Sequence, residues 1–196
     1  LCEVMLSDAG YLNEREVEWQ NRKRHQQGLP PLAPLYSLAD ARRAHRQFSG
    51  IRYDTNHEIL PGVSVTLLDA GHILGSSIVV LDLRDSGRHR RVVFSGDLGH
   101  TGAPILRDPT PVDQADLVVL ESTYGDRQHR DWQATWDEMG SVLGSANANR
   151  GNVLIPSFTV GRAQELLYIF KRYFQEWGLA EWQIFLDSPM AIEATE

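Results

Sequence analysis

The first fifty residues carry apolar side chains at helical spacing. From residue 2 to about residue 24 they recur every three or four positions among charged ones, which predicts one or two helices. Residues 26–35 contain three prolines and a glycine, which predicts a surface loop. Ser37 then precedes an alanine-rich run over residues 38–48 with Asp40 in its first turn. This arrangement predicts a second helix capped by Ser37.

The period then changes from helical to extended. Residues 63–68 alternate between apolar and polar, and residues 78–83 and 91–94 are mostly apolar and flank an Asp-Ser-Gly turn. They predict three strands, the last two joined as a hairpin. Residues 117–120 are almost wholly apolar, as expected of a strand covered on both faces. We therefore expect a central sheet sandwiched between other layers.

The last third of the chain alternates between helical and extended patterns. Helices are expected over residues 132–142 and 160–177, and buried strands over 152–155 and 183–186. Such alternation is typical of a parallel sheet. The fold class is therefore α/β, with one domain over residues 1–125 and the beginning of a second, parallel-sheet domain over residues 126–196.

Composition and charge narrow the functions and the cellular locations expected of this protein. The net charge of −7 argues against a protein that coats nucleic acid through its overall field. The single cysteine cannot form an internal disulfide, so a cytoplasmic location is expected. No apolar run approaches the roughly 20 residues that span a bilayer, so no membrane association is expected. The chain starts at Leu1 without the features of a signal peptide, which suggests an excised fragment.

Two polar residues in glycine-rich turns are candidates for a metal site. His72 lies in residues 70–76, AGHILGS, and Asp97 lies in residues 94–99, FSGDLG. Each also has a plain interpretation, as a surface histidine or as a turn-forming aspartate. Together they could serve a two-metal hydrolase, in which imidazole and a bridging carboxylate hold the ions. Zinc needs at least three protein ligands; His100 is a possible extra one, although it could simply be an exposed turn residue.

A candidate phosphate site lies at the expected start of the long helix. Ser157 and Arg162 could hold an RNA phosphate through free backbone N–H groups and a guanidinium group. The alternative is structural: Thr159 caps the helix, and Arg162 pairs with Glu165 or Glu121.

The turns with His72 and Asp97 belong to a longer series of motifs. They are followed in order by residues 120–126, LESTYGD, residues 155–165, IPSFTVGRAQE, and residues 186–191, LDSPMA. This series, from about residue 63 to residue 191, resembles the β-CASP branch of the metallo-β-lactamase superfamily, which includes ribonuclease J and the endonuclease subunit that cuts messenger RNA precursors.

The resemblance implies a fold and a set of roles. The fold would be part of a metallo-β-lactamase αββα sandwich, followed by the start of a β-CASP domain. His72 would ligate one zinc ion and Asp97 would bridge two, so that a shared hydroxide attacks the RNA. Glu121 would orient a histidine that acts as general acid. The resemblance also implies that the partner is single-stranded RNA, and that the protein acts as a homo-oligomer or as a subunit of a processing complex. A β-CASP DNA nuclease and a non-catalytic scaffold or RNA-binding subunit are the alternatives.

The sequence departs from the family pattern in two ways. The motif His-x-His-x-Asp-His and the later histidine motifs do not occur in these residues. We therefore expect this chain by itself to bind zinc weakly or not at all and to lack nuclease activity. The missing part of the sandwich also predicts a sheet with an exposed edge or apolar face.

Overall fold

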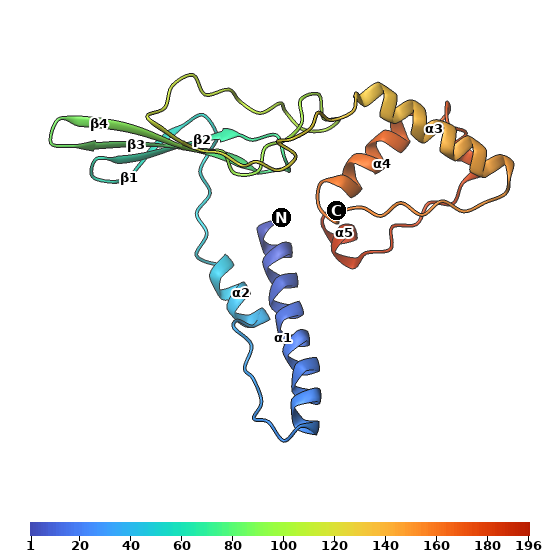
Figure 1. Ribbon diagram of the computed structural model, residues 1–196, viewed down its shortest axis with the longest axis horizontal. Coiled ribbons are helices and arrows are strands. Elements are labelled where there is room, and N and C mark those ends of the chain that lie inside the picture. The colour runs from blue at the N-terminus through green and yellow to red at the C-terminus, as the bar shows by residue number, and fades with distance from the viewer. The chain divides into compact units, whose positions relative to one another are not determined.

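The computed structural model describes residues 1–196, which form two compact units. The helical unit comprises Leu1–Gly50 and Phe185–Glu196, and the sheet unit comprises Ile51–Ile184 (Figure 1). None of the helices is both long and apolar enough to cross a membrane. The domain boundary expected after residue 125 stays a prediction.

The helical unit consists of α1 (Cys2–Gln26), α2 (Leu38–His45) and α5 (Pro189–Glu193). The first fifty residues thus follow the prediction, with one long helix before the loop. Ser37 and Asp40 form a capping box: the Ser37 hydroxyl accepts the Asp40 N–H at 3.1 Å, and the Asp40 carboxylate accepts the Ser37 N–H at 3.0 Å. Reciprocal bonds of this kind satisfy backbone groups that the first turn leaves unpaired. The predicted cap is confirmed.

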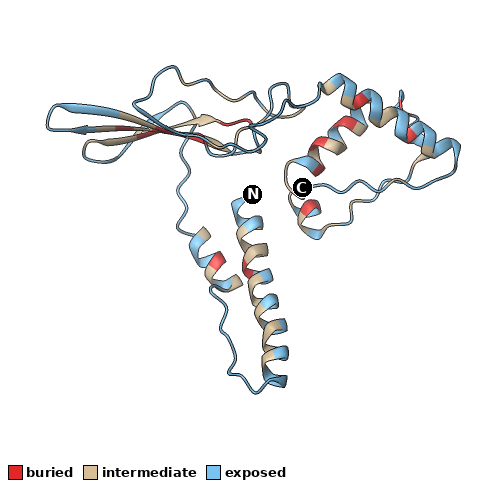
Figure 2. Ribbon diagram, in the orientation of Figure 1, coloured by how far each residue is buried: buried red, intermediate tan, exposed pale blue.

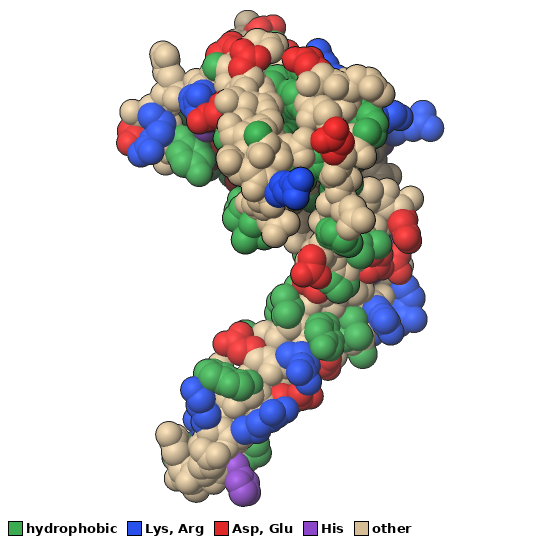
Figure 3. All heavy atoms as spheres, turned by 90° about the vertical axis from the view of Figure 1, so that its right-hand side faces the viewer, with side chains coloured by type: hydrophobic (Ala, Val, Ile, Leu, Met, Phe, Trp, Pro, Cys, Tyr) green, Lys and Arg blue, Asp and Glu red, His purple; other side chains and the backbone are tan.

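Charged side chains of both signs line the helical pair of α1 and α2. In the lower part of Figure 3, basic, acidic and apolar side chains are interspersed along it. Arg15 and Glu18 form an exposed ion pair on α1 at 3.3 Å. A surface of mixed sign does not attract a polyanion as a basic stripe would.

The sheet unit contains five strands in the spatial order β1-β2-β3-β4-β5. Four are antiparallel neighbours, and β5 pairs with β4 in parallel. Their bounds are β1 Asn56–Leu60, β2 Val63–Asp69, β3 Ser77–Asp85, β4 Arg88–Phe94 and β5 Leu117–Val119. The predicted hairpin is confirmed as β3 and β4. β1 went unpredicted because its polar start, Asn-His-Glu, resembles a loop.

One face of β3 is buried at every second residue. Ile78 and Val80 are in the core with Val93 and the fully buried Ala70, and Val112 packs against them. Alternation of this kind is what a strand with one covered face requires. Further along the same face Asp82 is also buried, where Arg91 (2.9 Å) and His89 (2.8 Å) bind its carboxylate and hold its pKa below the ordinary value.

The expectation of a sandwiched sheet is wrong for β5. Leu117, Val118 and Val119 are 48–56% exposed, and Leu120 after them is 64% exposed. In Figure 2 the sheet is mostly pale blue and tan, with red buried segments over only part of its length. The apolar pattern correctly indicated a strand suited to burial, but it carries no information on whether another segment covers that strand. The expectation of an exposed apolar face is confirmed instead.

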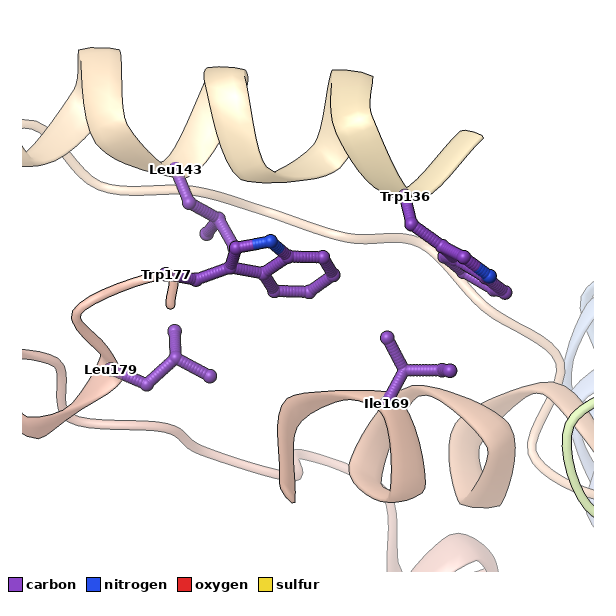
Figure 4. Packing of buried hydrophobic residues seen from close by; sticks show 5 residues of the cluster. All are labelled: Trp136, Leu143, Ile169, Trp177 and Leu179. Atoms are coloured by element: carbon purple, nitrogen blue, oxygen red, sulfur yellow. The ribbon is translucent and has the colours of Figure 1, made fainter. Parts of the chain in front are cut away.

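The remaining elements of the sheet unit are helical. They are α3 (Trp132–Ala148), α4 (Arg162–Arg172) and the short 3-10 helix η1 (Leu179–Glu181). Figure 4 shows Trp136 and Leu143 projecting from α3 toward Ile169 of α4, with Trp177 and Leu179 completing the cluster. Ile169 is fully buried. Both predicted helices are confirmed, although α4 is shorter than residues 160–177.

The two strands predicted in the last third do not form. Residues 152–155 and 183–186 have no regular secondary structure, and Leu154 and Phe185 are 91% and 81% exposed. A strand needs a neighbour to pair its backbone N–H and C=O groups, and neither segment has one. The expected parallel sheet of the second domain is therefore absent from the structure, while the mixed α/β class, with its parallel pair β4–β5, is confirmed.

Candidate active site

His72 lies in the turn between β2 and β3. Gly71 adopts a left-handed backbone conformation (φ 65°), which glycine tolerates at little cost. The Ser76 hydroxyl accepts the backbone N–H groups of His72 (3.0 Å) and Ile73 (3.2 Å), and Tyr53 donates to the Ser76 carbonyl at 2.8 Å. The backbone of the turn is thus fixed while the imidazole of His72 remains exposed.

Asp97 lies in the turn that follows β4, and Gly99 brings this turn onto the first. The Gly99 N–H donates to the Ala70 carbonyl at 2.8 Å. A Cβ at Gly99 would lie 1.7 Å from the Gly71 carbonyl oxygen, so only glycine permits this approach. As a result, His72 Nε2 lies 4.0 Å from Asp97 Oδ2.

Glu121 follows β5 and is bonded to the Asp97 turn. Its carboxylate accepts the Leu98 N–H at 2.5 Å, and its own N–H donates to the hydroxyl of the buried Ser95 at 3.0 Å. The bond from Leu98, followed by a bond from Thr123, lowers the pKa of Glu121, and the nearby His72 acts in the same direction. Glu121 is therefore a fixed carboxylate beside the other two residues.

The distance between His72 and Asp97 suits two ligands of one metal ion. Zinc lies about 2.0–2.2 Å from nitrogen and carboxylate oxygen, so a single ion can reach both atoms. No group of three or more metal-binding side chains occurs within residues 1–196. His100 does not join the pair, because its ring packs edge-on against His129 and Trp132. These residues fit part of a zinc site and not a whole one.

The start of α4 adjoins the His72 turn. A Cβ at Gly161 would lie 2.9 Å from Ile73 Cγ2. Arg162 pairs with Glu165 at 2.7 Å, as one structural alternative anticipated, and Ser157 is exposed. The helix cap is Gly161, whose N–H donates to the Gln164 side chain at 2.7 Å; the proposed cap at Thr159 is wrong.

Two features of this region were not predicted from the sequence, namely the bond from Ser95 and the burial of Glu165. Ser95 connects the Asp97 turn to Glu121 through its hydroxyl. Glu165 is buried, and loss of solvation raises its pKa, although the charges of Arg162 and His72 oppose that rise. The position of Ser95 at the end of a strand was a usable signal. No sequence signal indicated the burial of Glu165, because a glutamate in the first turn of a helix is usually solvated and interacts favourably with the helix dipole.

Glu121 gives the stability of the sheet unit a pH dependence. Its pKa is lower in the folded than in the unfolded chain, so its stabilisation is complete above the unfolded pKa and is lost as the pH falls through the folded one. We expect the free energy of unfolding to fall less steeply in Glu121→Gln than in the parent protein between about pH 6 and about pH 3. Urea unfolding at several pH values measures this difference, and equal slopes would contradict it.

No protein-family model matches the chain. Individual proteins do. Ribonuclease TTHA0252 of Thermus thermophilus is 43% identical over 132 residues, which cover 67% of this chain and 29% of that protein. Transcription termination factor FttA of Cenarchaeum symbiosum is 34% identical over 160 residues, or 79% of this chain and 24% of that protein.

A eukaryotic relative extends the comparison. Endoribonuclease YSH1 of Kluyveromyces lactis is 29% identical over 162 residues, which cover 80% of this chain and 20% of that protein. The chain thus spans between a fifth and a third of the length of these three relatives. Together with the ordered motifs around His72, Asp97 and Glu121, these similarities place the chain in the β-CASP ribonuclease branch of the metallo-β-lactamase family.

Proposed function

We propose that this chain supplies part of the active site of a metal-dependent hydrolase that cleaves phosphodiester bonds of single-stranded RNA. The observation that carries the proposal is the approach of His72 Nε2 to Asp97 Oδ2, 4.0 Å apart on two turns beside Glu121. The relatives named as ribonucleases support RNA as the substrate. A cytoplasmic location and a processing complex or homo-oligomer stay predictions.

The roles follow from the chemistry of the side chains. His72 and Asp97 are proposed as metal ligands, and zinc is the metal that a mixed nitrogen and carboxylate set suits. This pair by itself is not a complete zinc site. Glu121 is proposed to accept a ring N–H from a general-acid histidine, since a fixed carboxylate holds the imidazole in one tautomer.

Ser157 and Arg162 are proposed to contact a phosphate of the RNA backbone. Arg162 is half exposed although it pairs with Glu165, so its guanidinium group keeps donors that face solvent, and bidentate contact with a phosphate is available to it. Its helix adjoins the His72 turn through Gly161 and Ile73.

Cleavage tests the proposal in the protein that carries this sequence. We expect it to cut single-stranded RNA in the presence of zinc, to stop after chelation, and to lose roughly 100-fold or more of its rate in His72→Ala. His25→Ala, an exposed histidine on α1, is the matched control. Cleavage of DNA alone would favour the DNA nuclease, and RNA binding without cleavage would favour the non-catalytic subunit.

Zinc titration tests the partial site in the 196-residue chain alone. We expect weak binding, with a Kd well above micromolar, because two ligands give little affinity compared with the three or four of complete sites. His72→Ala is expected to abolish what remains, and isothermal titration calorimetry measures both. Equimolar binding with a sub-micromolar Kd would contradict the partial-site interpretation.

A further inference from the structure

A series of rings in contact runs from the helical core to the surface beside the candidate active site. Trp136 of α3 stacks on Trp132 (5.2 Å between centroids), which meets His100 edge-on (5.2 Å). His100 meets His129 (5.2 Å), and His129 meets Tyr124 (5.4 Å). Trp136 is buried, whereas Tyr124 is 58% exposed. The inner rings therefore serve the core, and the outer ones are open to solvent.

The outer rings adjoin the proposed catalytic residues along two segments. His100 comes three residues after Asp97, and the indole N–H of Trp132 donates to the Thr101 carbonyl at 2.9 Å, which fastens α3 to that turn. Tyr124 comes three residues after Glu121. A ligand whose phosphate lay at His72 and Asp97 would pass close to these rings.

The chemistry of this surface suits a nucleobase. Imidazole and phenol rings are faces on which bases stack, and stacking does not depend on base identity. The Arg127 guanidinium lies 5.9 Å from the centroid of the Tyr124 ring, beside the aromatic face, and is paired with the Asp126 carboxylate at 2.9 Å. An exposed phenol ring beside a planar guanidinium group offers flat surfaces to a planar base, and so suits a base better than it suits an apolar protein side chain.

We propose that Tyr124 and His129, with Arg127 beside them, form a stacking surface for a nucleobase next to the phosphate that is cleaved. This proposal rests on the proposed function, because it takes RNA as the ligand. The stacking surface would bind a base, beside the metal ligands and phosphate contacts proposed above.

The test measures binding of a fluorescent single-stranded RNA to the 196-residue chain in a chelator, so that no cleavage intervenes. Tyr124→Ala is expected to weaken binding about 5- to 140-fold, since one stacked base contributes about 1–3 kcal/mol. Tyr124→Phe keeps the ring and should change the Kd less than about twofold. Tyr11→Ala, the same change at an exposed tyrosine of α1, is the control and should leave the Kd unchanged.

An abasic RNA of equal length separates stacking from other effects of the substitution. It should bind the parent and Tyr124→Ala equally, and RNA with 5-iodouridine should form a photochemical cross-link to Tyr124 or His129 that mass spectrometry locates. RNA binding that Tyr124→Ala leaves unchanged, or that it weakens equally for abasic RNA, would overturn the stacking surface and leave the nuclease proposal intact. Absence of RNA binding by the parent chain would overturn the stacking surface as well, and the cleavage assay would then decide the nuclease proposal separately.

Discussion

Replacing Gly99 by alanine is expected to destabilise the sheet unit by about 3 kcal/mol or more, which marks a severe clash and not an ordinary surface change. The added Cβ would lie 1.7 Å from the Gly71 carbonyl oxygen. Because this oxygen belongs to the backbone, no change of side-chain rotamer can relieve the clash. The two turns must separate, which breaks the bond from the Gly99 N–H to Ala70. Urea unfolding of the variant measures the loss.

Gly144→Ala is the matched control for Gly99→Ala. Gly144 lies within α3, where nothing would meet an added Cβ within 4 Å. Alanine in a helix interior is favoured over glycine by about 1 kcal/mol, so this variant should be slightly more stable than the parent. A loss at Gly99 no larger than about 1 kcal/mol would show that the close approach of the two turns is absent in solution.

The same substitution bears on the candidate site. His72 and Asp97 are close only because their turns are held together at Gly71 and Gly99. In Gly99→Ala, any residual zinc affinity should therefore fall as far as it does in His72→Ala, although both ligands are still present. Small displacements of ligands carry such costs because metal sites need fixed geometry.

Ile169→Ala is expected to destabilise the helical core of the sheet unit by about 2–5 kcal/mol, the range for loss of a large aliphatic side chain from a packed interior. Ile169 is fully buried and lies between the side chains of α3 and the segment after α4. The cavity left behind has little means of closing, because two tryptophan rings border it (Figure 4). Thermal or urea unfolding measures the change.

The control for Ile169→Ala is the same substitution at an exposed position of another helix. Ile192 of α5 is 45% exposed, so Ile192→Ala should cost less than about 1 kcal/mol. Equal losses at the two positions would mean that the core shown around Trp136 and Trp177 does not form. This result would also remove the support of α4 for Arg162.

The patterns that gave correct predictions act over a few neighbouring residues. Ser37 and Asp40 meet within one helical turn, and the hairpin of β3 and β4 is closed by a short turn. His72, Asp97 and Glu121 were selected as candidates because glycine-rich turns and strand ends can be recognised in a single sequence, and because their order matches a known family; their roles stay predictions. The predictions of burial for residues 117–120 and of strands over residues 152–155 and 183–186 were wrong, because burial and strand pairing both need partners from elsewhere in the fold.

The sequence by itself determined helices α1 to α4, strands β2, β3 and β4 and the candidate ligands, because each depends on side-chain spacing along one segment. Only the tertiary structure decided which of those residues meet. The approach of Gly99 to Gly71 sets the distance between His72 and Asp97, and the bonds of Glu121 to Leu98 and Ser95 place its carboxylate. These contacts join segments more than twenty residues apart, and no local pattern specifies where two such backbones come together.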